Sequence, residues 1–324
     1  MANRKRKLHY SGIGGQAVLE GVMMKNTDDY AIAVRKPDGE IDVDIEVFHP
    51  ILKNSPLRKI PFIRGIFNFI DSLVIGMKSI NHSSKFYEMD ENEEPTGLDK
   101  ALDAVSGGRS ESILTGITTI VALVIAIGLF MVLPYFITQK LNSYVRNESL
   151  LAIIEGVVRL VIFLIYIIGI SCMKDIKRLY RYHGAEHKCI NCIERGHSLT
   201  VSNVMRSSRY HKRCGTSFIF LVMIVSIVLF FFIRVESPVY RVLIRIALVP
   251  VIAGISYEII RLAGRFDNIF MSIISAPGIW LQGITTKEPD EQMVEVAIRS
   301  VEAVFDWKQF LVEEFDFDED DFEE

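Results

Sequence analysis

Four long apolar runs constrain the fold of this chain more than any other feature of its sequence. Residues 113–138, 150–173, 216–233 and 239–260 are each of spanning length, because about 20 residues at a rise of 1.5 Å per residue cross the ~30 Å hydrocarbon core of a bilayer. Hydrophobic residues make up 50% of the chain, yet 23% of its residues are charged. We therefore predict a mostly α-helical membrane protein with about four transmembrane helices and sizeable parts in water.

The charges of the connections predict how these runs are oriented. The connection between the second and third runs is long and basic, whereas the other two carry very few Lys or Arg residues. Its basic residues are Lys174, Lys177, Arg178, Arg181, Lys188, Arg195, Arg206, Arg209, Lys212 and Arg213. Because basic loops stay inside the cell, we expect this connection and both termini to be cytoplasmic and the protein to lie in the cell membrane. The basic start is not followed by the apolar segment of a signal peptide.

The chain divides into five predicted regions. They are an N-terminal β-containing cytoplasmic lobe at 1–60, an amphipathic or interfacial helix at 61–87, an acidic linker at 88–112, the transmembrane bundle at 113–284 with its basic cytoplasmic loop at 174–213, and a C-terminal amphipathic helix with an acidic tail at 285–324. In the lobe, residues 30–35 and 40–48 alternate between apolar and polar around a Pro-Asp-Gly turn, which predicts a β-hairpin. The glycines of residues 12–21 fit neither the P-loop nor the dinucleotide fingerprint, so we expect turns and strands there.

Two further apolar stretches are too polar or too broken for simple spans. Residues 61–80 are interrupted by charged residues such as Arg64 and Asp71, which favours an interfacial amphipathic helix or a helix packed on the bundle. Residues 266–281 are broken at Pro277, and this pattern favours the same kind of helix or a re-entrant turn enclosed by protein.

The sharpest chemical signal is the pattern His-x-x-Glu-His, formed by His183, Glu186 and His187. In a helix, the two histidines are four residues apart on one face, a spacing that lets two imidazoles bind one metal ion. In the inverted zinc-peptidase pattern the histidines bind zinc, and the glutamate is the base that activates water. We therefore predict a divalent metal, with Zn²⁺ as the preferred ion, at His183 and His187, and Glu186 as the candidate catalytic base.

Two histidines are half of a metal site, and three residues distant in sequence are candidates to complete it. His211 and Cys214 lie just before the third run, and both side chains suit zinc. Glu258 lies near the end of the fourth run, where an ionisable side chain is costly and usually functional. The second and fourth runs end, and the third begins, on the same side of the membrane. We therefore expect these segments to meet at the cytoplasmic end of the bundle.

Each candidate also has a structural interpretation. The two histidines of the basic connection would meet anionic headgroups, and His211 or Cys214 would cap a helix or lie in a core. Glu258 would pair with a buried base. Glu155 and Arg159, four residues apart in the second run, are predicted to form a structural ion pair.

A competing metal site uses the cysteines differently. Cys189 and Cys192, taken with His211 and Cys214, have roughly the spacing of a zinc ribbon. Such a site would be structural, with four protein ligands and no open position for water. Because cytoplasmic thiols are kept reduced, free thiols or metal ligands are expected rather than disulfides.

Six motifs spread over almost the whole chain carry a resemblance to a known family. They are GGQAVLEGVMM at 14–24, RG at 64–65, YHGAEHK at 182–188, CGTSF at 214–218, GISYEIIR at 254–261 and TTKEPD at 285–290. With these motifs the chain resembles the bacterial DUF1385 family. The resemblance implies an integral membrane protein and a metal-dependent enzyme. The description of the family as metal-dependent enzymes depends on the same histidines, so it gives no independent support for a metal site. Cys189 and Cys192 are not part of the family pattern, which weakens the zinc-ribbon interpretation.

These features lead to a divalent-metal-dependent hydrolase, with its site at the cytoplasmic membrane face, as the leading hypothesis. The alternative is a non-catalytic membrane scaffold or biogenesis factor that binds protein partners through its cytoplasmic parts. A transporter is a third hypothesis, but the sequence shows no visible inverted repeat. We expect contact with the lipid bilayer and no specific binding of nucleic acid.

Overall fold

The computed structural model describes residues 8–87, 110–233, 235, 237–265, 268–315, 317–318 and 322. The chain forms two compact units. The larger unit contains Met1–Glu88, Ile167–Val225 and Val249–Glu324, and the smaller unit contains Met89–Tyr166 and Ser226–Leu248. Most of the predicted acidic linker at 88–112, and most of the acidic tail after residue 315, lie outside the described residues.

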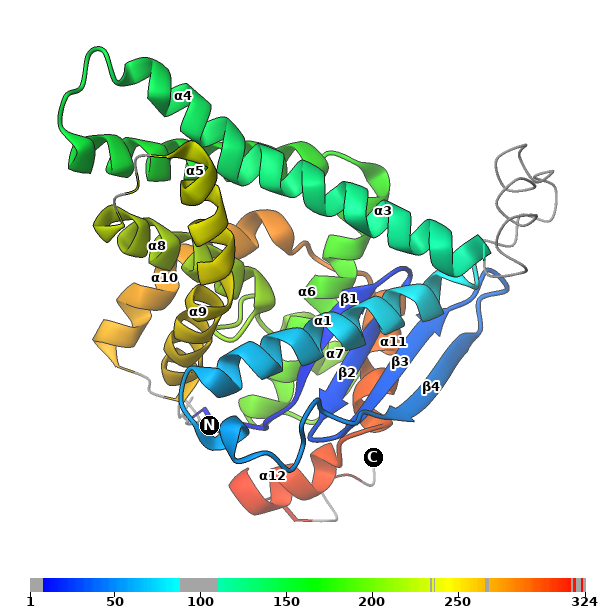
Figure 1. Ribbon diagram of the computed structural model, residues 1–324. Coiled ribbons are helices and arrows are strands. Elements are labelled where there is room, and N and C mark those ends of the chain that lie inside the picture. The colour runs from blue at the N-terminus through cyan, green and yellow to red at the C-terminus, as the bar shows by residue number, and fades with distance from the viewer. Residues whose placement is uncertain are drawn as a thin grey trace. The chain divides into compact units, whose positions relative to one another are not determined.

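The larger unit contains a four-stranded antiparallel sheet (Figure 1). Its strands β1 (Gly14–Val18), β2 (Gly21–Asn26), β3 (Asp29–Arg35) and β4 (Ile41–Val47) lie side by side in chain order. The predicted hairpin is confirmed as β3 and β4, since Arg35 pairs with Ile41 across a turn in which Gly39 has a φ of 91°. Glycine adopts such a positive φ without steric cost, which explains its place in the turn. The glycine-rich residues 12–21 supply β1 and the turn into β2, as expected.

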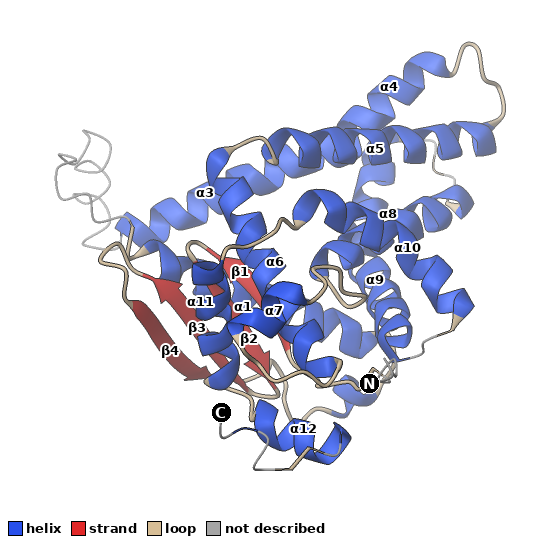
Figure 2. Ribbon diagram, turned by 180° about the vertical axis from the view of Figure 1, so that it is seen from behind, coloured by secondary structure: helices blue, strands red, loops and turns tan. Residues whose placement is uncertain are grey.

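Helices cover both faces of this sheet (Figure 1, Figure 2). A short 3₁₀ helix, η1 (Pro56–Lys59), leads into α1 (Ile63–Ser84) on one face, and α6 (Lys174–Glu194) and α11 (Glu291–Glu302) lie on the other. Each face of the sheet has its own hydrophobic core, and alternate residues of β2 contribute to the two cores in turn. Met23 packs with Ile75 of α1, whereas Val22 and Met24 pack with α6 and α11. Since both faces are covered, β2 and β3 are buried along most of their length, and their sequences are almost continuously apolar.

The basic connection between the second and third predicted spans is mostly helical and partly core, rather than a surface loop. It contains α6 and the short helix α7 (Val201–Arg206), and α12 (Trp307–Phe315) packs on the same core. Tyr182, Ala185, Cys189 and Ile193 of α6 are buried against the sheet and α11. Residues 174–213, which were predicted as a basic loop, therefore include a helix that has an apolar face in addition to its charged residues.

Four helices are long and apolar enough to cross a membrane, which confirms the predicted spans. The apolar stretches are Gly116–Leu141, Ser149–Ile170, Gly215–Phe232 and Val239–Gly264. The first contains most of α3 (Ser110–Ile127), then the π-helical turn η2 (Gly128–Val132) and α4 (Leu133–Leu141); the others lie in α5 (Glu148–Ile170), α8 (Gly215–Phe232) and α9 (Pro238–Arg265). The fold is thus mostly α-helical with a small N-terminal sheet, as predicted.

A buried ion network in the smaller unit confirms the predicted pair of Glu155 and Arg159. Arg159 donates to Oε1 of Glu155 at 3.0 Å, and Arg245 of α9 donates to Oε2 at 3.0 Å. Nε of Arg159 also donates to the carbonyl of Phe130 at 2.8 Å. That carbonyl lies four residues before Pro134, which has no N–H to complete the helical hydrogen bond. Arg159 thus donates hydrogen bonds both to a buried carboxylate and to a backbone oxygen that lacks its usual helical donor because of the proline.

The apolar helix α10 (Ile269–Thr285) runs through Pro277 without the break that the sequence suggested. The next residue, Gly278, packs closely on α8, because a Cβ at this position would lie 2.6 Å from the Cβ of Ser217. The Pro-Gly pair therefore marks a tight helix contact rather than a reversal of the chain.

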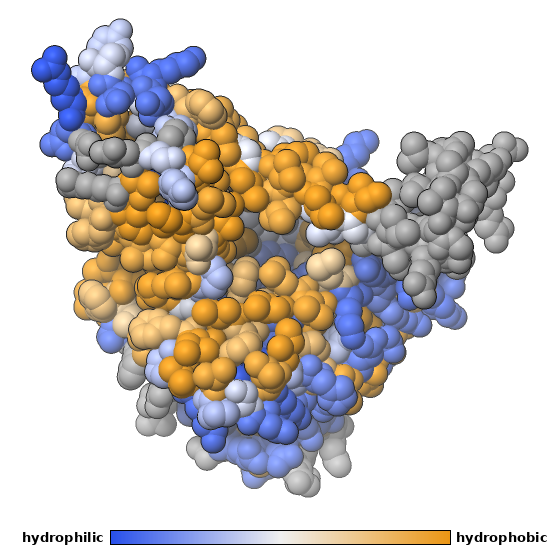
Figure 3. All heavy atoms as spheres, in the orientation of Figure 1, coloured by the Kyte–Doolittle hydropathy of each residue, from blue (hydrophilic) through white to orange (hydrophobic). Residues whose placement is uncertain are grey.

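Helix α1 has two apolar faces of different kinds. Its inner face, which includes Ile75, is buried on the sheet. Its outer face exposes the large apolar side chains Ile70, Leu73, Val74, Met77 and Ile80, and Figure 3 shows apolar surface along this helix. A helix in contact with water alone would carry polar residues there, so this outer face is suited to a bilayer surface or to a partner.

Replacement of Gly184 by alanine should destabilise the larger unit. The new Cβ would lie 2.0 Å from the carbonyl oxygen of Lys287, so α6 and the segment after α10 would have to separate. We expect a loss of about 1–3 kcal/mol, the usual cost of an overpacked contact. The measurement is the apparent melting temperature of the protein in detergent.

Gly283→Ala is the matched control, because a Cβ at this helical glycine would meet open space. Its melting temperature should equal that of the unmodified protein or rise slightly. Equal melting temperatures for the two variants would contradict the close packing of α6 on the Lys287 backbone.

Candidate metal centre

Helix α6 and the start of α8 bring three metal-binding side chains together in the larger unit. His183 and His187 are one turn apart on α6, with ring centroids separated by 4.4 Å. Cys214 lies directly before α8, with its Sγ 3.2 Å from Nε2 of His183. One ligand atom from each of these residues lies within 4.8 Å of the others. The three side chains form a group that can hold a metal ion.

Backbone carbonyls fix the orientation of both histidine rings. Nδ1 of His183 lies 2.9 Å from the carbonyl oxygen of Thr285, and Nδ1 of His187 lies 2.6 Å from that of Arg209. A carbonyl only accepts hydrogen bonds, so each Nδ1 carries a proton and donates it. Nε2 of each neutral ring is therefore left with a lone pair. Metal-binding histidines are usually held in this way.

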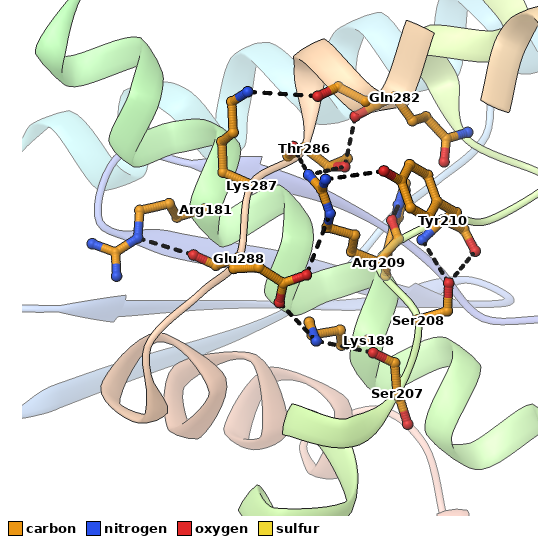
Figure 4. Close-up of polar contacts among 12 residues, drawn as sticks. Arg181, Lys188, Ser207, Ser208, Arg209, Tyr210, Gln282, Thr286, Lys287 and Glu288 are labelled. Atoms are coloured by element: carbon orange, nitrogen blue, oxygen red, sulfur yellow. Dashed lines mark hydrogen bonds and ion pairs between the residues drawn. The ribbon is translucent and has the colours of Figure 1, made fainter. Parts of the chain in front are cut away.

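A network of charges holds the segments that supply these carbonyls (Figure 4). Glu288 lies between two cations, with its oxygens 3.3 Å from Nε of Arg209 and 2.9 Å from Nζ of Lys188. Arg209 also donates to the carbonyl of Thr286, and Nε of Arg181 donates to the carbonyl of Glu288 at 3.1 Å. Arg181 also pairs with Asp290 at 2.9 Å. The motif at 285–290 therefore fixes both α6 and Arg209, whose backbone orients His187.

The three donors influence one another electrostatically. Burial would raise the pKa of the Cys214 thiol, but the imidazoles of His183 and His187 outweigh burial and hold that pKa well below its ordinary value. Burial would lower the pKa of His183, but the neighbouring Cys214 outweighs it and raises the pKa to about 9. A thiolate beside an imidazolium is therefore favoured, with Nε2 of His183 donating its proton to Sγ of Cys214; a metal ion that binds Nε2 would replace that proton. The thiolate is also the form of cysteine that binds metal ions.

Glu186 is a buried carboxylate with an unused oxygen. Its side chain is buried, and its Oε2 has no hydrogen-bond partner among the described residues. Burial raises its pKa, and the nearby charges of His183 and His187 oppose this effect. A buried polar atom without a partner is uncommon and indicates a missing ligand or water. Glu186 thus has the environment expected of a proton-transfer group.

The other predicted ligands have different partners. Nε2 of His211 lies 3.4 Å from Oε2 of Glu194, and the backbone N–H of Arg213 donates to Nδ1 of His211. Arg64 binds both carboxylate oxygens of Glu258, at 2.6 and 2.5 Å. His211 and Glu258 therefore lie outside the group formed by the two α6 histidines and the cysteine.

The cysteines of the zinc-ribbon interpretation are buried in the core between the sheet and α11. Burial raises the pKa of Cys189 well above its ordinary value and that of Cys192 to about 12. Sγ of Cys192 is 3.5 Å from the carbonyl oxygen of Ser198. Among the described residues neither thiol belongs to a group of metal ligands, so both behave as core side chains.

Sequence reasoning missed the role of Glu194. Its side chain is 0% exposed, and it accepts hydrogen bonds from Ser11, from both N–H at 3.0 Å and Oγ at 2.8 Å, and from Arg213. It also faces His211. Burial would raise the pKa of Glu194, but His211 and Arg213 outweigh it and lower the pKa to about 2. No motif marked this residue, because its partners come from distant parts of the chain.

The fold and the site together define a class of protein, namely mostly helical proteins with four candidate membrane spans, a small sheet, and a largely buried group of two histidines and a cysteine that could hold a metal ion. The sequence profile of the family described as "Protein of unknown function (DUF1385)" matches residues 60–307. The chain belongs to this family. It is also 37% identical over 292 residues to "Uncharacterized protein YqhQ" of Bacillus subtilis (strain 168), which covers 89% of this chain and 90% of the relative. No solved structure matches the chain.

Glu194→Gln should destabilise the protein in a pH-dependent way. A carboxylate whose pKa falls on folding from 4.5 to about 2 stabilises the folded state. That stabilisation is fully present above pH 4.5, where it amounts to about 3 kcal/mol. It is lost as the pH falls from 4.5 to 2. The difference in apparent melting temperature between the unmodified protein and the variant should therefore be large at pH 7 and shrink over this range.

Glu313→Gln, at an exposed position on α12, is the control and should show little difference at any pH. A Glu194→Gln effect that stayed constant between pH 7 and pH 2.5 would mean that packing, rather than charge, explains the loss.

Proposed function

We propose that this protein is a zinc-dependent hydrolase whose site lies at the cytoplasmic face of the membrane. The observation that carries the proposal is the convergence of Cys214 with two histidines whose Nδ1 atoms are both bound to backbone carbonyls. Free histidines in a basic segment have no reason to share this orientation. The same constraint is usual where Nε2 binds a metal.

The donor set favours zinc and an enzyme rather than a structural site. Two imidazoles and one thiolate suit Zn²⁺, and three protein ligands leave a fourth position open, as in catalytic zinc sites. Bound zinc would supply Lewis acidity, which lowers the pKa of water and polarises the bond to be cleaved. The predicted ligands His211 and Glu258 are not needed to complete this set.

Glu186 is proposed as the general base. It follows His183 by three residues and precedes His187 by one, so the same turn of α6 carries all three side chains. Its buried Oε2 without a partner among the described residues is available to accept a proton from the attacking water and to pass it to the leaving group. Burial raises its pKa above that of an ordinary glutamate, which is the usual environment of a catalytic carboxylate.

The charges of the chain support a position of the site on the cytoplasmic side of the membrane. The segment that contains α6 and Arg209 carries most of the Lys and Arg residues found between the four candidate spans. The positive-inside rule therefore favours a cytoplasmic position for this segment, and with it for the site. A hydrolase in this position would act close to the membrane surface.

A non-catalytic scaffold is the second candidate, and one surface favours it. Strand β4 is an edge strand of the described sheet, and its side chains Val43, Ile45 and Val47 are exposed. An exposed apolar edge strand is a common site for pairing with another chain. Recovery of the same partners by a variant with His183, Glu186 and His187 all changed to alanine would favour the scaffold over the hydrolase.

Purified protein should contain about one zinc ion per chain. His187→Ala and Cys214→Ser each remove one of three protein ligands, so the zinc content should fall to well below half an equivalent after mild dialysis against a chelator. Elemental analysis measures this directly. Cys172→Ser is the matched control because Cys172 is an exposed free thiol outside the site, and its zinc content should be unchanged.

Absence of stoichiometric metal from the unmodified protein, with His187→Ala behaving identically, would remove the metal centre. A full equivalent of zinc in Cys214→Ser would show instead that the thiol is not a ligand.

Glu186→Gln should separate metal binding from catalysis. The amide keeps the shape of the side chain but cannot act as a base, so zinc content should be retained while kcat falls by about 10²–10⁴. The assay uses the zinc-loaded protein with chromogenic ester, phosphoester and peptide probes. Full activity of the variant would exclude Glu186 as the base, and inactivity of the unmodified protein towards every probe would favour the scaffold.

A further inference from the structure

A cavity of about 550 Å³ borders the candidate metal centre within the larger unit. His183, Glu186, His187 and Cys214 line one side of it. The rest of its wall is mostly apolar, although it includes polar residues such as Gln16 and Arg213, and it is formed by residues of β1, α1, α6, α8 and α9 and of the segment before α8. A site built for a small polar substrate would not need a hydrophobic space of this size.

Helix α1 and the ends of two candidate spans supply much of the apolar wall. Phe69 and Leu73 come from α1, Phe218 and Ile219 from α8, and Ile260 from α9. The rings of Phe69 and Phe218 lie 5.4 Å apart, so α1 and α8 are in contact beside the cavity. The cavity therefore lies where candidate spans meet the polar part of the larger unit.

Part of the rim of the cavity is apolar. Leu73 and Ile219 both line the cavity, yet they are 50% and 46% exposed. Ile219 belongs to a helix long and apolar enough to cross a membrane, and Leu73 belongs to the apolar outer face of α1 (Figure 3). An opening between two such surfaces faces hydrocarbon more readily than water.

The size and chemistry of the cavity restrict its occupant. An α-helix is about 10 Å wide and rises about 5.4 Å per turn, so a helical peptide would fill this volume with about one turn. An extended peptide needs hydrogen-bond partners for its backbone along its whole length; Gln16 and Asn68 could supply some, but most of the exposed lining is apolar. A hydrocarbon chain needs only apolar contact, which stabilises it by about 0.8 kcal/mol for each buried CH₂ group.

We propose that the substrate is a long-chain amphiphile of the membrane whose hydrocarbon chain enters between Leu73 and Ile219 and lies in this cavity. Its polar end then reaches Cys214 and Glu186, where the bond to be hydrolysed is placed. This inference rests on the proposed hydrolase, and it adds the class of substrate and its route of entry. Binding from the side lets the substrate reach the site without leaving the bilayer.

Photolabelling from the bilayer tests the proposal. The full-length, zinc-loaded protein is placed in phosphatidylglycerol vesicles that contain a small share of a phospholipid with a diazirine at the end of one acyl chain. Illumination attaches the chain to the residues that it touches, and mass spectrometry maps them. We expect labels around Leu179 and Ile190 of α6, which line the cavity and do not belong to a candidate span.

Ser72→Trp should block this entry. Ser72 is exposed on α1 and lines the cavity, so an indole there would fill the opening, and labelling of α6 should fall about tenfold. Labelling of the lipid-facing residues of α5 should stay the same. Asn81→Trp is the matched control, because Asn81 is exposed on the same helix but away from the cavity. Equal labelling of α6 in the two variants would overturn the proposal.

Zinc analysis of the same samples separates the two proposals. One equivalent of zinc without any label on α6 would overturn the cavity inference and leave the metal centre intact. A label on α6 without zinc would overturn the hydrolase and retain the chain-binding cavity. Loss of the label with excess hydrophobic peptide, but not with excess unlabelled lipid, would assign the cavity to a peptide and overturn the proposal.

Discussion

Two hydrogen bonds from histidine rings to backbone carbonyls are the interactions on which the candidate site depends. His183 binds the carbonyl of Thr285 at the end of α10, and His187 binds that of Arg209 between α7 and α8. A helix with the same His-x-x-Glu-His spacing, but without these carbonyls, would leave both rings free to rotate. The site is therefore a product of the tertiary structure of the larger unit, because segments far apart in sequence must be in place before the donors converge on Cys214.

Paired charges make that structure possible in buried surroundings. Lys188 is buried, but it contacts Glu288 and two carbonyl oxygens, and the fully buried Glu194 is matched by Arg213. A single buried charge left unpaired costs several kcal/mol. Glu186, on the same helix, differs because one of its oxygens has no partner in the described part of the chain. Satisfied carboxylates and cations thus support the structure, and the incompletely satisfied carboxylate is the one that we propose as the base.

The sequence predicted the features that depend on local pattern. It missed those that depend on which face of a helix packs against the rest of the protein. The four spans follow from the length of apolar runs, and the hairpin of β3 and β4 follows from alternation around a turn. The spacing of His183 and His187, with the shared membrane side of the third run, was enough to bring Cys214 into consideration. Burial of α6 did not follow, because its charged residues hide an apolar face that only the sheet and α11 reveal. The choice between a metal and a basic side chain as the partner of Glu258 did not follow either, since spacing along a span does not fix its neighbours; the structure shows the base, Arg64.

Glu258 shows how a carboxylate within a span can contribute to a site without touching it. Its two hydrogen bonds from Arg64 fix α1 on α9, where Gly65 approaches Gly254 so closely that a Cβ would lie 3.0 Å from the facing Cα. An apolar pair at these positions would pack, but its attraction would have no preferred direction. A bidentate guanidinium–carboxylate pair does have one. Since α1 also supplies Phe69 to the cavity wall, the pair holds one side of the space beside His183, His187 and Cys214, and this is a structural reason for a charged residue in an apolar helix.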